Sequence, residues 1–341
     1  MTILITGGAG FIGFHLANKI LESGHKVVVA DNLNTYYDPE LKKRRLEELR
    51  KSANQFNSPF YFFQINIDNF DALREIFTIH NPTHVVNLAA QAGVRYSIEN
   101  PSAYIQANLV GFANVLECCR QFNIEHLIFA SSSSVYGGNK NLPFSEHQGV
   151  DHPVSLYAAT KKSNELMAHS YSHLYGLSAT GLRFFTVYGP WGRPDMALFL
   201  FTKAIIEGEP INIFNNGQMS RDFTYIDDII ESILRLLPKP ASPNISFRTK
   251  NPDPSTSWAS YRIFNIGNSK AIPLMKYIQA IEVALDTKAK MNLMPMQPGD
   301  VEHTLADTSA LEKWINFKPT TSIEIGITKF IEWYKNFYQV S

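Results

Sequence analysis

An apolar strand that runs directly into three glycines near the start of the chain constrains its fold more than any other feature. Residues 3–6 read Ile-Leu-Ile-Thr, and Gly7, Gly10 and Gly13 follow, with a helix expected from Phe11 to Ser23. Glycines in such a turn let bare backbone approach a pyrophosphate, and the positive end of the helix faces that charge. The spacing predicts a dinucleotide-binding turn, although glycines in a tight turn can also serve packing alone.

A carboxylate in the right place favours the dinucleotide interpretation over packing. The second apolar strand, Lys26 to Ala30, ends at Asp31, eighteen residues after Gly13. A carboxylate there accepts hydrogen bonds from the adenosine ribose hydroxyls. It disfavours the 2′-phosphate of NADP, and the next residues, Asn32-Leu33-Asn34, offer no arginine. We therefore expect NAD as the cofactor.

Strand and helix patterns alternate from residue 2 to about residue 185, as βαβ units require. We expect a Rossmann fold over residues 1–185, an α/β doubly wound parallel sheet. A smaller α/β substrate-binding domain should follow over residues 186–341, with some chain exchange between the two. A ligand should lie in the crevice at the carboxyl ends of the strands. The expected strands are 3–6, 26–31, 60–65, 84–88, 126–131 and 179–185, and the helices between them 11–23, 39–52, 70–80, 101–121 and 155–175. After residue 185 we expect strands over 211–214, 221–225 and 261–266, helices from about 226, over 274–285 and over 322–337, and a surface connection over 238–258.

The balance of charge does not indicate a nucleic-acid partner. The 31 basic residues match 31 acidic ones, and the longest basic run, Lys42-Lys43-Arg44-Arg45, lies at helical spacing near glutamates. We interpret that run as a solvated helix face. No stretch approaches the roughly eighteen apolar residues of a membrane span, so a membrane partner is not expected either.

The two cysteines indicate a reducing compartment. Cys118 and Cys119 are neighbours within a helical pattern, which suits neither an ordinary structural disulfide nor a metal site. The first strand begins so early that no room is left for a signal peptide. We expect a cytoplasmic protein without a metal.

A tyrosine and a lysine four residues apart predict the chemistry of the crevice. Tyr157 and Lys161 share one face of an expected helix, and the serine-rich strand end around Ser132 lies about twenty-five residues upstream. An adjacent ammonium and a nicotinamide cation both favour the phenolate of a tyrosine, whose ordinary pKa is about 10. Alone, such a pair is more often a coincidence on an exposed helix. Together with the glycine turn, it predicts Tyr157 as a general base.

These motifs resemble the extended short-chain dehydrogenase/reductase family that acts on nucleotide sugars. The resemblance covers nearly the whole chain and rests on residues 6–13, Asp31, 88–90, 131–137, 157–161 and 221–228. More narrowly, segments 31–37, 90–97, 183–196 and 297–301 are similar to those of UDP-glucuronate 4-epimerases.

The resemblance implies a role for each matching residue. Ser132 would bond the sugar's 4-oxygen, Tyr157 would take the 4-hydroxyl proton, and Lys161 would bind the nicotinamide ribose while lowering the pKa of Tyr157. The implied cofactor-binding residues are Gly7, Gly10, Phe11, Ile12, Gly13, Asp31, Asn32, Asn34, Asn66, Ile67, Leu88, Ala89, Ala90, Gln91, Asn108, Tyr157 and Lys161. The implied substrate-binding residues are Arg95, Ser132, Ser133, Thr186, Arg193, Arg221 and Asp300.

Within that last set, the resemblance places Arg221 on the diphosphate and Asp300 on the uridine ribose. For the carboxylate of a uronate sugar we favour Thr186 over Arg95 and Arg193, because a close arginine could promote loss of CO₂ from a 4-keto sugar. Two departures stand out: Asn66 replaces an aspartate common in the wider family, and Gln297 replaces an arginine of some relatives.

The residues after Ser132 argue against a dehydratase. Related dehydratases carry an Asp-Glu pair and decarboxylases a Glu where this chain has Ser133 and Ser134. Elimination of water would lack its acid and base. What remains is oxidation at C4, rotation of the 4-keto sugar and return of the hydride, with NAD recycled.

Two alternatives stay open, and one expectation about assembly rests on analogy alone. The chain could epimerise UDP-glucose or a UDP-N-acetylhexosamine instead of UDP-glucuronate. It could also be an NAD-binding regulatory scaffold, although such a protein does not need Ser132, Tyr157 and Lys161 together. By analogy, the helices over 101–121 and 155–175 would form a homodimer.

Overall fold

One seven-stranded parallel sheet organises the computed structural model of the chain, which describes residues 1–297 and 300–340. Its strand order is β10-β6-β5-β4-β1-β2-β3, and every neighbouring pair is parallel. The order reverses between β1 and β4, which is where an open α/β sheet leaves a crevice for a ligand. The strands are β1 Thr2–Thr6, β2 Lys26–Asp31, β3 Phe60–Gln64, β4 His84–Asn87, β5 His126–Ser132, β6 Ala179–Phe184 and β10 Tyr261–Ile266.

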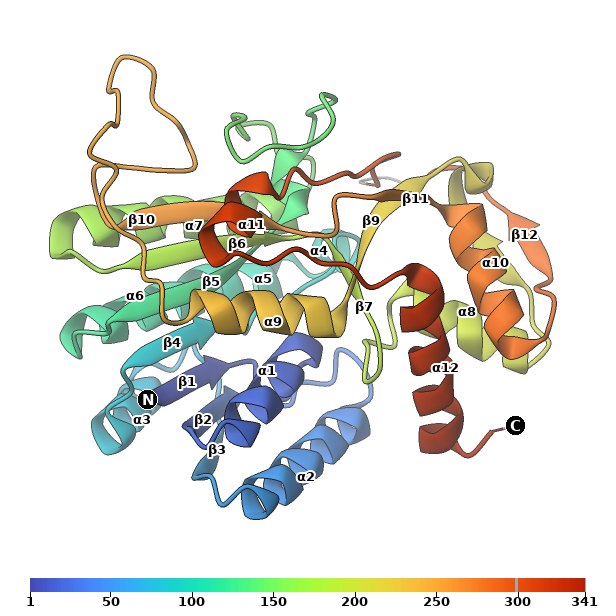
Figure 1. Cartoon of the computed structure of the whole chain (residues 1–341), viewed down its shortest axis with the longest axis horizontal. Helices are drawn as coiled ribbons and strands as arrows, with labels where there is room; N and C mark the ends of the chain where they lie inside the picture. The colour runs from blue at the N-terminus through green and yellow to red at the C-terminus, as the bar shows by residue number, and fades with distance from the viewer. Residues whose placement is uncertain (298–299, 341) are drawn as a thin grey trace.

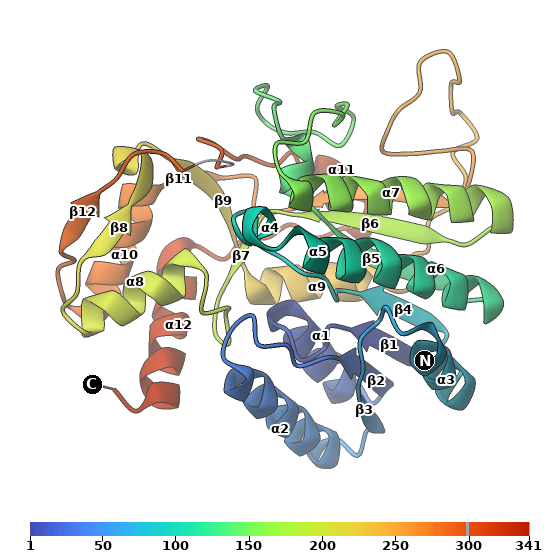
Figure 2. The same ribbon diagram turned by 180° about the vertical axis from the view of Figure 1, so that it is seen from behind.

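Helices cover both faces of this sheet because alternate residues of each strand point to opposite sides. Ile3 and Ile5 of β1 pack with α1 and α9, whereas Leu4 packs with α3 and α6. Figure 1 shows α1, α2 and α9 on the near face, and Figure 2 shows α6 and α7 on the other. The helices are α1 Phe11–Glu22, α2 Pro39–Gln55, α3 Phe70–His80, α4 Tyr96–Glu99, α5 Pro101–Tyr104, α6 Gly111–Gln121, α7 Leu156–Tyr175, α9 Ile226–Leu236 and α11 Ser309–Ile315. A π-helical segment, Ile105–Val110, joins α5 to α6, and a 3₁₀ turn, Ser133–Tyr136, follows β5.

A second group of elements lies beside the carboxyl ends of the central strands (Figure 1). It holds a three-stranded sheet, β11-β9-β7, a two-stranded sheet, β12-β8, and three helices. Their bounds are β7 Thr186–Tyr188, β8 Ile211–Ile213, β9 Ser220–Tyr225, β11 Ala271–Pro273, β12 Met291–Leu293, α8 Ala197–Ile206, α10 Leu274–Leu285 and α12 Ile323–Tyr338, with a 3₁₀ turn at Phe214–Gly217.

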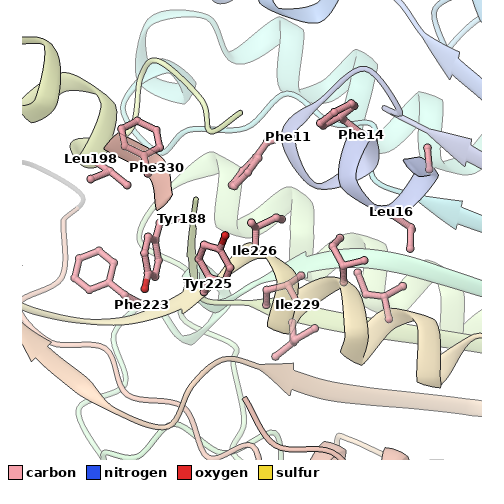
Figure 3. Packing of buried hydrophobic residues seen from close by; sticks show 14 of the residues in the cluster. Phe11, Phe14, Leu16, Tyr188, Leu198, Phe223, Tyr225, Ile226, Ile229 and Phe330 are labelled. Carbon is pink, nitrogen blue, oxygen red and sulfur yellow. The ribbon is translucent and has the colours of Figure 1, made fainter. Parts of the chain in front are cut away.

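The two groups share one hydrophobic core. Figure 3 shows Phe11 and Phe14 of α1 continuing through Tyr225 and Ile226 to the aromatic side chains beside α8. At that far end the rings of Phe223 and Tyr277 stack with centroids 3.9 Å apart. A core that is continuous across both groups fixes the walls of the crevice between them.

The structure confirms the expected strand and helix pattern and adds features that the sequence did not show. The single helix expected over 101–121 is interrupted by the π-helical segment, and α8 and α11 were not predicted. Strand β10 comes from beyond residue 185 yet pairs with β6 in the central sheet. Residues 238–258 form the protruding loop between α9 and β10 (Figure 1).

No helix in the described ranges is both long enough and apolar enough to cross a membrane.

The interpretation of the basic run as a solvated helix face was wrong for half of it. Lys43 and Arg44 are exposed and paired with glutamates, but Lys42 and Arg45 are buried. Helical periodicity explains the split, since positions three apart lie on one face of α2 and the two between them lie on the other.

Candidate active site

A cavity of about 1210 Å³ opens where the central strands end and the second group of elements begins. It is lined by backbone and side chains from both groups, so neither could form it alone. Nearly all residues predicted for the site line it: Gly7, Gly10, Phe11, Ile12, Gly13, Asp31, Asn32, Asn34, Asn66, Ile67, Leu88, Ala89, Ala90, Gln91, Arg95, Ser132, Ser133, Tyr157, Lys161, Thr186, Arg193, Arg221 and Asp300.

The glycine turn fits a dinucleotide because side chains are sterically excluded from it. A Cβ on Gly13 would lie 2.3 Å from the carbonyl oxygen of Gly7, and Gly7 itself has a φ of +73°. Helix α1 starts at Phe11 without a side-chain cap, so its first N–H groups remain available to an anion. The residues present therefore suit the pyrophosphate of NAD.

Asp31 stands at the end of β2, where the ribose is expected. One oxygen accepts from the Ala9 N–H at 3.0 Å and the other from the Leu33 N–H at 2.9 Å. These bonds fix the carboxylate and leave lone pairs for hydroxyl donors. Asn32 donates to the Asn66 side chain at 2.7 Å, so the amide at position 66 takes part in the same wall.

Ser132, Tyr157 and Lys161 meet on the opposite wall. Ser132 ends β5, and its hydroxyl lies 3.1 Å from that of Ser134. Tyr157 and Lys161 lie one turn apart on α7, which the Ser155 side chain caps by accepting from the Ala158 N–H. The Lys161 ammonium donates to the Ala130 carbonyl at 2.8 Å. Hydroxyl, phenol and ammonium thus surround one part of the cavity.

Burial shifts the pKa values of both titratable members of this set. It lowers the pKa of Lys161 to about 8 and raises that of Tyr157. The Ser132 hydroxyl and the Arg193 guanidinium oppose the second shift by lowering the pKa of Tyr157. The expectation that Lys161 also lowers this pKa stays a prediction; in the structure its ammonium is bonded to Ala130, and Ser132 and Arg193 are the groups that lower the pKa of the phenol.

The far end of the cavity carries two arginines and a carboxylate. Arg95 pairs with Asp300 at 2.9 Å, and its guanidinium lies 4.7 Å from the centroid of the Phe214 ring. Among the described residues, Arg221 donates only to the Ser220 and Glu302 carbonyls, each at 3.0 Å. The Asp300 carboxylate also acts on Arg221 by raising its pKa against the effect of burial, so the predicted diphosphate and ribose contacts lie near each other. Pro298 and Gly299, part of the motif at 297–301, lie outside the described residues.

Thr186 and Arg193, the other candidates for a carboxylate contact, differ in how they are engaged. Arg193 forms a two-point pair with Asp195, which also accepts from the Tyr36 hydroxyl at 3.2 Å. The Thr186 hydroxyl has no hydrogen bond to any described residue, and it lines the cavity. Arg193 is thus already neutralised, whereas the hydroxyl of Thr186 is free to donate.

The structure places one predicted residue behind the wall and reveals others that the sequence analysis missed. Asn108 does not line the cavity; it donates to the Gln91 carbonyl at 3.0 Å and accepts from the Gln91 N–H at 2.8 Å, so it braces the wall. Lys42 and Tyr36 line the cavity although neither was predicted. Residues of α8 and β8 also line the cavity, namely Leu200, Phe201, Ala204, Ile211 and Asn212. For α8, the available signal in the sequence was its largely apolar stretch at 197–206.

This combination of sheet, glycine turn, Asp31 and Ser–Tyr–Lys set defines a dinucleotide-dependent enzyme that moves hydride to and from an alcohol carbon. Comparison with known proteins gives the family. Residues 3–267 match the model of the NAD dependent epimerase/dehydratase family, and the chain belongs to that family.

Two relatives and one solved structure are similar to this chain over nearly their whole lengths. A Staphylococcus aureus protein named Protein CapI is 56% identical, with 99% of this chain and 100% of the relative covered. A probable UDP-glucuronate 4-epimerase of Rhizobium meliloti is 48% identical, with 99% and 98% covered. The crystal structure of UDP-glucuronic acid 4-epimerase from Bacillus cereus, in complex with UDP-glucuronic acid and NAD, matches at a TM-score of 0.86 and 32% identity, with 99% of this chain and 100% of that chain covered.

Proposed function

We propose that this protein is a UDP-glucuronate 4-epimerase, which interconverts UDP-glucuronate and UDP-galacturonate through a 4-keto sugar. The observation that carries the proposal is the Ser132–Tyr157–Lys161 set facing one cavity with the free hydroxyl of Thr186. Relatives that bear this activity in their names, one of them 48% identical over nearly the whole chain, support the choice of substrate.

In the proposed reaction, the glycine turn and Asp31 would hold NAD, which would supply the acceptor for the hydride of C4 and its later donor to the other face of the sugar. Tyr157 removes the proton of the 4-hydroxyl, and Ser132 holds the 4-oxygen by a hydrogen bond. Tyr157 then returns the proton to the 4-oxygen after the ring has turned. Lys161 holds the nicotinamide ribose, as its buried ammonium needs further acceptors beyond Ala130.

The carboxylate of the substrate must be held without being lost. A 4-keto uronate is a β-keto acid, so a strongly electrostatic contact would be hazardous. Thr186 is our proposed partner for the carboxylate because a neutral hydroxyl fixes its orientation. The pairing of Arg193 with Asp195 supports this view, since the pair as a whole is neutral and the Nε and Nη2 donors of Arg193 are already bonded to Asp195.

The remaining site assignments are proposals of the same kind. We assign Arg221 to the diphosphate and Asp300 to the uridine ribose. Such a ribose contact requires Asp300 to release Arg95 or to share its carboxylate with it. For NAD we assign the residues of the glycine turn, Asp31 with its asparagine neighbours, and the wall formed by residues 88–91.

A product assay on several UDP-sugars tests the function. A hydrogen bond to a charged group is worth roughly 1.5–3 kcal/mol, so UDP-glucuronate should exceed UDP-glucose in kcat/KM by about tenfold to a hundredfold. Thr186→Val should reduce this preference. Equal or better turnover of UDP-glucose by the unmodified protein would refute the uronate assignment and favour the UDP-glucose alternative. An unchanged preference in Thr186→Val would move the carboxylate contact elsewhere.

We also propose a homodimer that works in the cytoplasm. The outer faces of the π-helical segment and α7 carry exposed apolar side chains, among them Val110, Leu166 and Leu174, which a partner copy would cover. Both cysteines are buried and unpaired, as suits a reducing compartment. Analytical ultracentrifugation of the protein and of Leu166→Glu tests the interface.

A further inference from the structure

Arg45 is a buried cation whose position none of the catalytic assignments explains. It lies in the second turn of α2, it is fully buried, and its side chain does not line the cavity. None of the carboxylates in the described ranges pairs with it, and its Nε atom is buried there without a hydrogen-bond partner. A buried charge of this kind is costly, so it is expected to serve a purpose beyond filling space.

The guanidinium instead bonds neutral acceptors from three separate segments. Nη1 donates to the carbonyl of Ala9 at 2.9 Å and to the Tyr37 hydroxyl at 2.8 Å. Nη2 donates to the carbonyls of Trp191 at 2.5 Å and Gly192 at 3.4 Å. Arg45 therefore joins the cofactor turn, the loop after β2 and the loop after β7.

On the cofactor side, Arg45 acts on the turn that receives the dinucleotide. The N–H of Ala9 donates to Asp31 and its carbonyl accepts from Arg45, so the residue between Gly8 and Gly10 is held from both sides. The orientation of this residue sets the direction of the chain as it enters α1. The first N–H groups of α1 are the ones that would face the pyrophosphate of a bound NAD.

On the sugar side, the loop held by Arg45 has a strained backbone. Trp191 has a φ of +60°, a left-handed conformation that a bulky residue adopts only when its surroundings impose it. His15 donates to the preceding carbonyl, that of Pro190, at 2.9 Å, and burial lowers its pKa to about 4, so the ring is neutral. Three successive loop carbonyls thus accept from side chains of α1 and α2.

That loop leads directly into the sugar site. Arg193 follows Gly192, lines the cavity, and lowers the pKa of Tyr157. Its partner Asp195 accepts from Tyr36, the neighbour of the Tyr37 that Arg45 holds. Displacement of Trp191 and Gly192 would therefore move a charge next to the proposed general base.

We propose that Arg45 is a positioning residue that couples the dinucleotide turn to the loop carrying Arg193, so that one guanidinium sets both the NAD seat and the sugar pocket. The part concerning turnover rests on the proposed epimerase function, whereas the part concerning NAD does not. A side chain that only filled the core would affect stability without changing either site.

The test uses a substitution one residue away as its control. Arg45→Met removes all four bonds, Arg45→Lys keeps the charge but not the fork, and Arg44→Met alters an exposed arginine of the same helix that pairs with Glu40 and Glu47. For each protein we would measure thermal stability, NAD affinity after cofactor removal, kcat and KM for UDP-glucuronate, and reduced nicotinamide accumulating without product. The last quantity reports escape of the 4-keto sugar before the hydride returns.

We expect Arg45→Met to weaken NAD binding by about tenfold, to lower kcat by about 10–100-fold, and to accumulate reduced nicotinamide. Arg45→Lys should lie between Arg45→Met and the parent, and Arg44→Met should stay within about twofold of the parent.

Parental NAD affinity, kcat and KM in a folded but less stable Arg45→Met would overturn the proposal. If that variant fails to fold, Arg45→Lys decides: agreement with Arg44→Met in all three quantities overturns it. A parent inactive on UDP-glucuronate would refute the proposed function while the NAD comparison still tests the coupling.

Discussion

Replacing Lys161 by methionine should stabilise the cofactor-free protein while abolishing its function. The ammonium is buried with only the Ala130 carbonyl as its hydrogen-bond partner in the described structure. Burial lowers its pKa from the ordinary 10.5 to about 8. One pKa unit corresponds to about 1.4 kcal/mol, so the charged side chain costs the folded state about 3 kcal/mol at neutral pH. Methionine has a similar length and no charge to desolvate.

The pH dependence of this difference follows from the sign of the shift. Between pH 8 and pH 10.5 the unfolded chain binds more protons at Lys161 than the folded one does, so the parent gains stability as pH rises. The full destabilisation is present below the folded pKa and vanishes above the unfolded one. The advantage of Lys161→Met should therefore be greatest at pH 7 and shrink towards pH 10.

Urea unfolding of cofactor-free proteins at pH 7, 9 and 10 measures this advantage directly. Lys43→Met, on the exposed face of α2, is the control and should show no such trend. Lys161→Met should also lose NAD during gel filtration and lose turnover, because the ammonium is the proposed ribose contact. A variant that is less stable than the parent at pH 7, by an amount independent of pH, would refute the reasoning.

Three further predictions concern the base, its neighbour and the cofactor. Tyr157→Phe should lower kcat by about 10²–10⁴-fold in steady-state assays with fold and bound NAD intact, and activity within a few-fold of the parent would remove Tyr157 from the mechanism. Ser132→Ala should shift the acidic limb of the kcat/KM profile to higher pH, because its hydroxyl lowers the pKa of Tyr157; an unmoved limb would contradict that influence. The protein should bind NAD in preference to NADP, and Asp31→Ser with an arginine introduced nearby should admit NADP; equal affinity of the unmodified protein for both cofactors, measured by titration, would exclude this role for Asp31.

The sequence predicted best those features whose signals are local. The glycine turn, Asp31 and the Tyr157–Lys161 pair are each defined within a short stretch of sequence, and the structure brings them to one cavity. Strand β10 was predicted as a strand, but its place beside β6 depends on pairing across some eighty residues, which no local pattern encodes. The residues of α8 that line the cavity were missed because two short apolar stretches separated by Thr202 and Lys203 do not distinguish a helix from a strand pair.

The basic run on α2 shows why charge alone is a poor guide to exposure. Lys43 and Arg44 behave as a solvated helix face, with glutamates three and four residues away. Lys42 and Arg45 have the same chemistry and point inward, where Lys42 donates to Asn34. What decides between these outcomes is the supply of acceptors on the buried side, and those acceptors belong to loops outside α2, from Asn34 nearby in the sequence to Trp191 and Gly192 far away.

The arginines of the site differ in their partners rather than in their sequence context, and the partners suggest how the work is divided. Arg193 is neutralised by Asp195, and Arg95 is paired with Asp300. Arg221 directly contacts only carbonyl oxygens among the described residues, and burial lowers its pKa. A partly buried cation whose hydrogen bonds go only to neutral groups is stabilised by an anion that reaches it, and the diphosphate is the anion that the proposed substrate supplies. Arg45 is also bonded only to neutral groups, but it lies behind the cavity wall where no ligand can reach it. Its effect on NAD and sugar must therefore pass through the backbone that it holds.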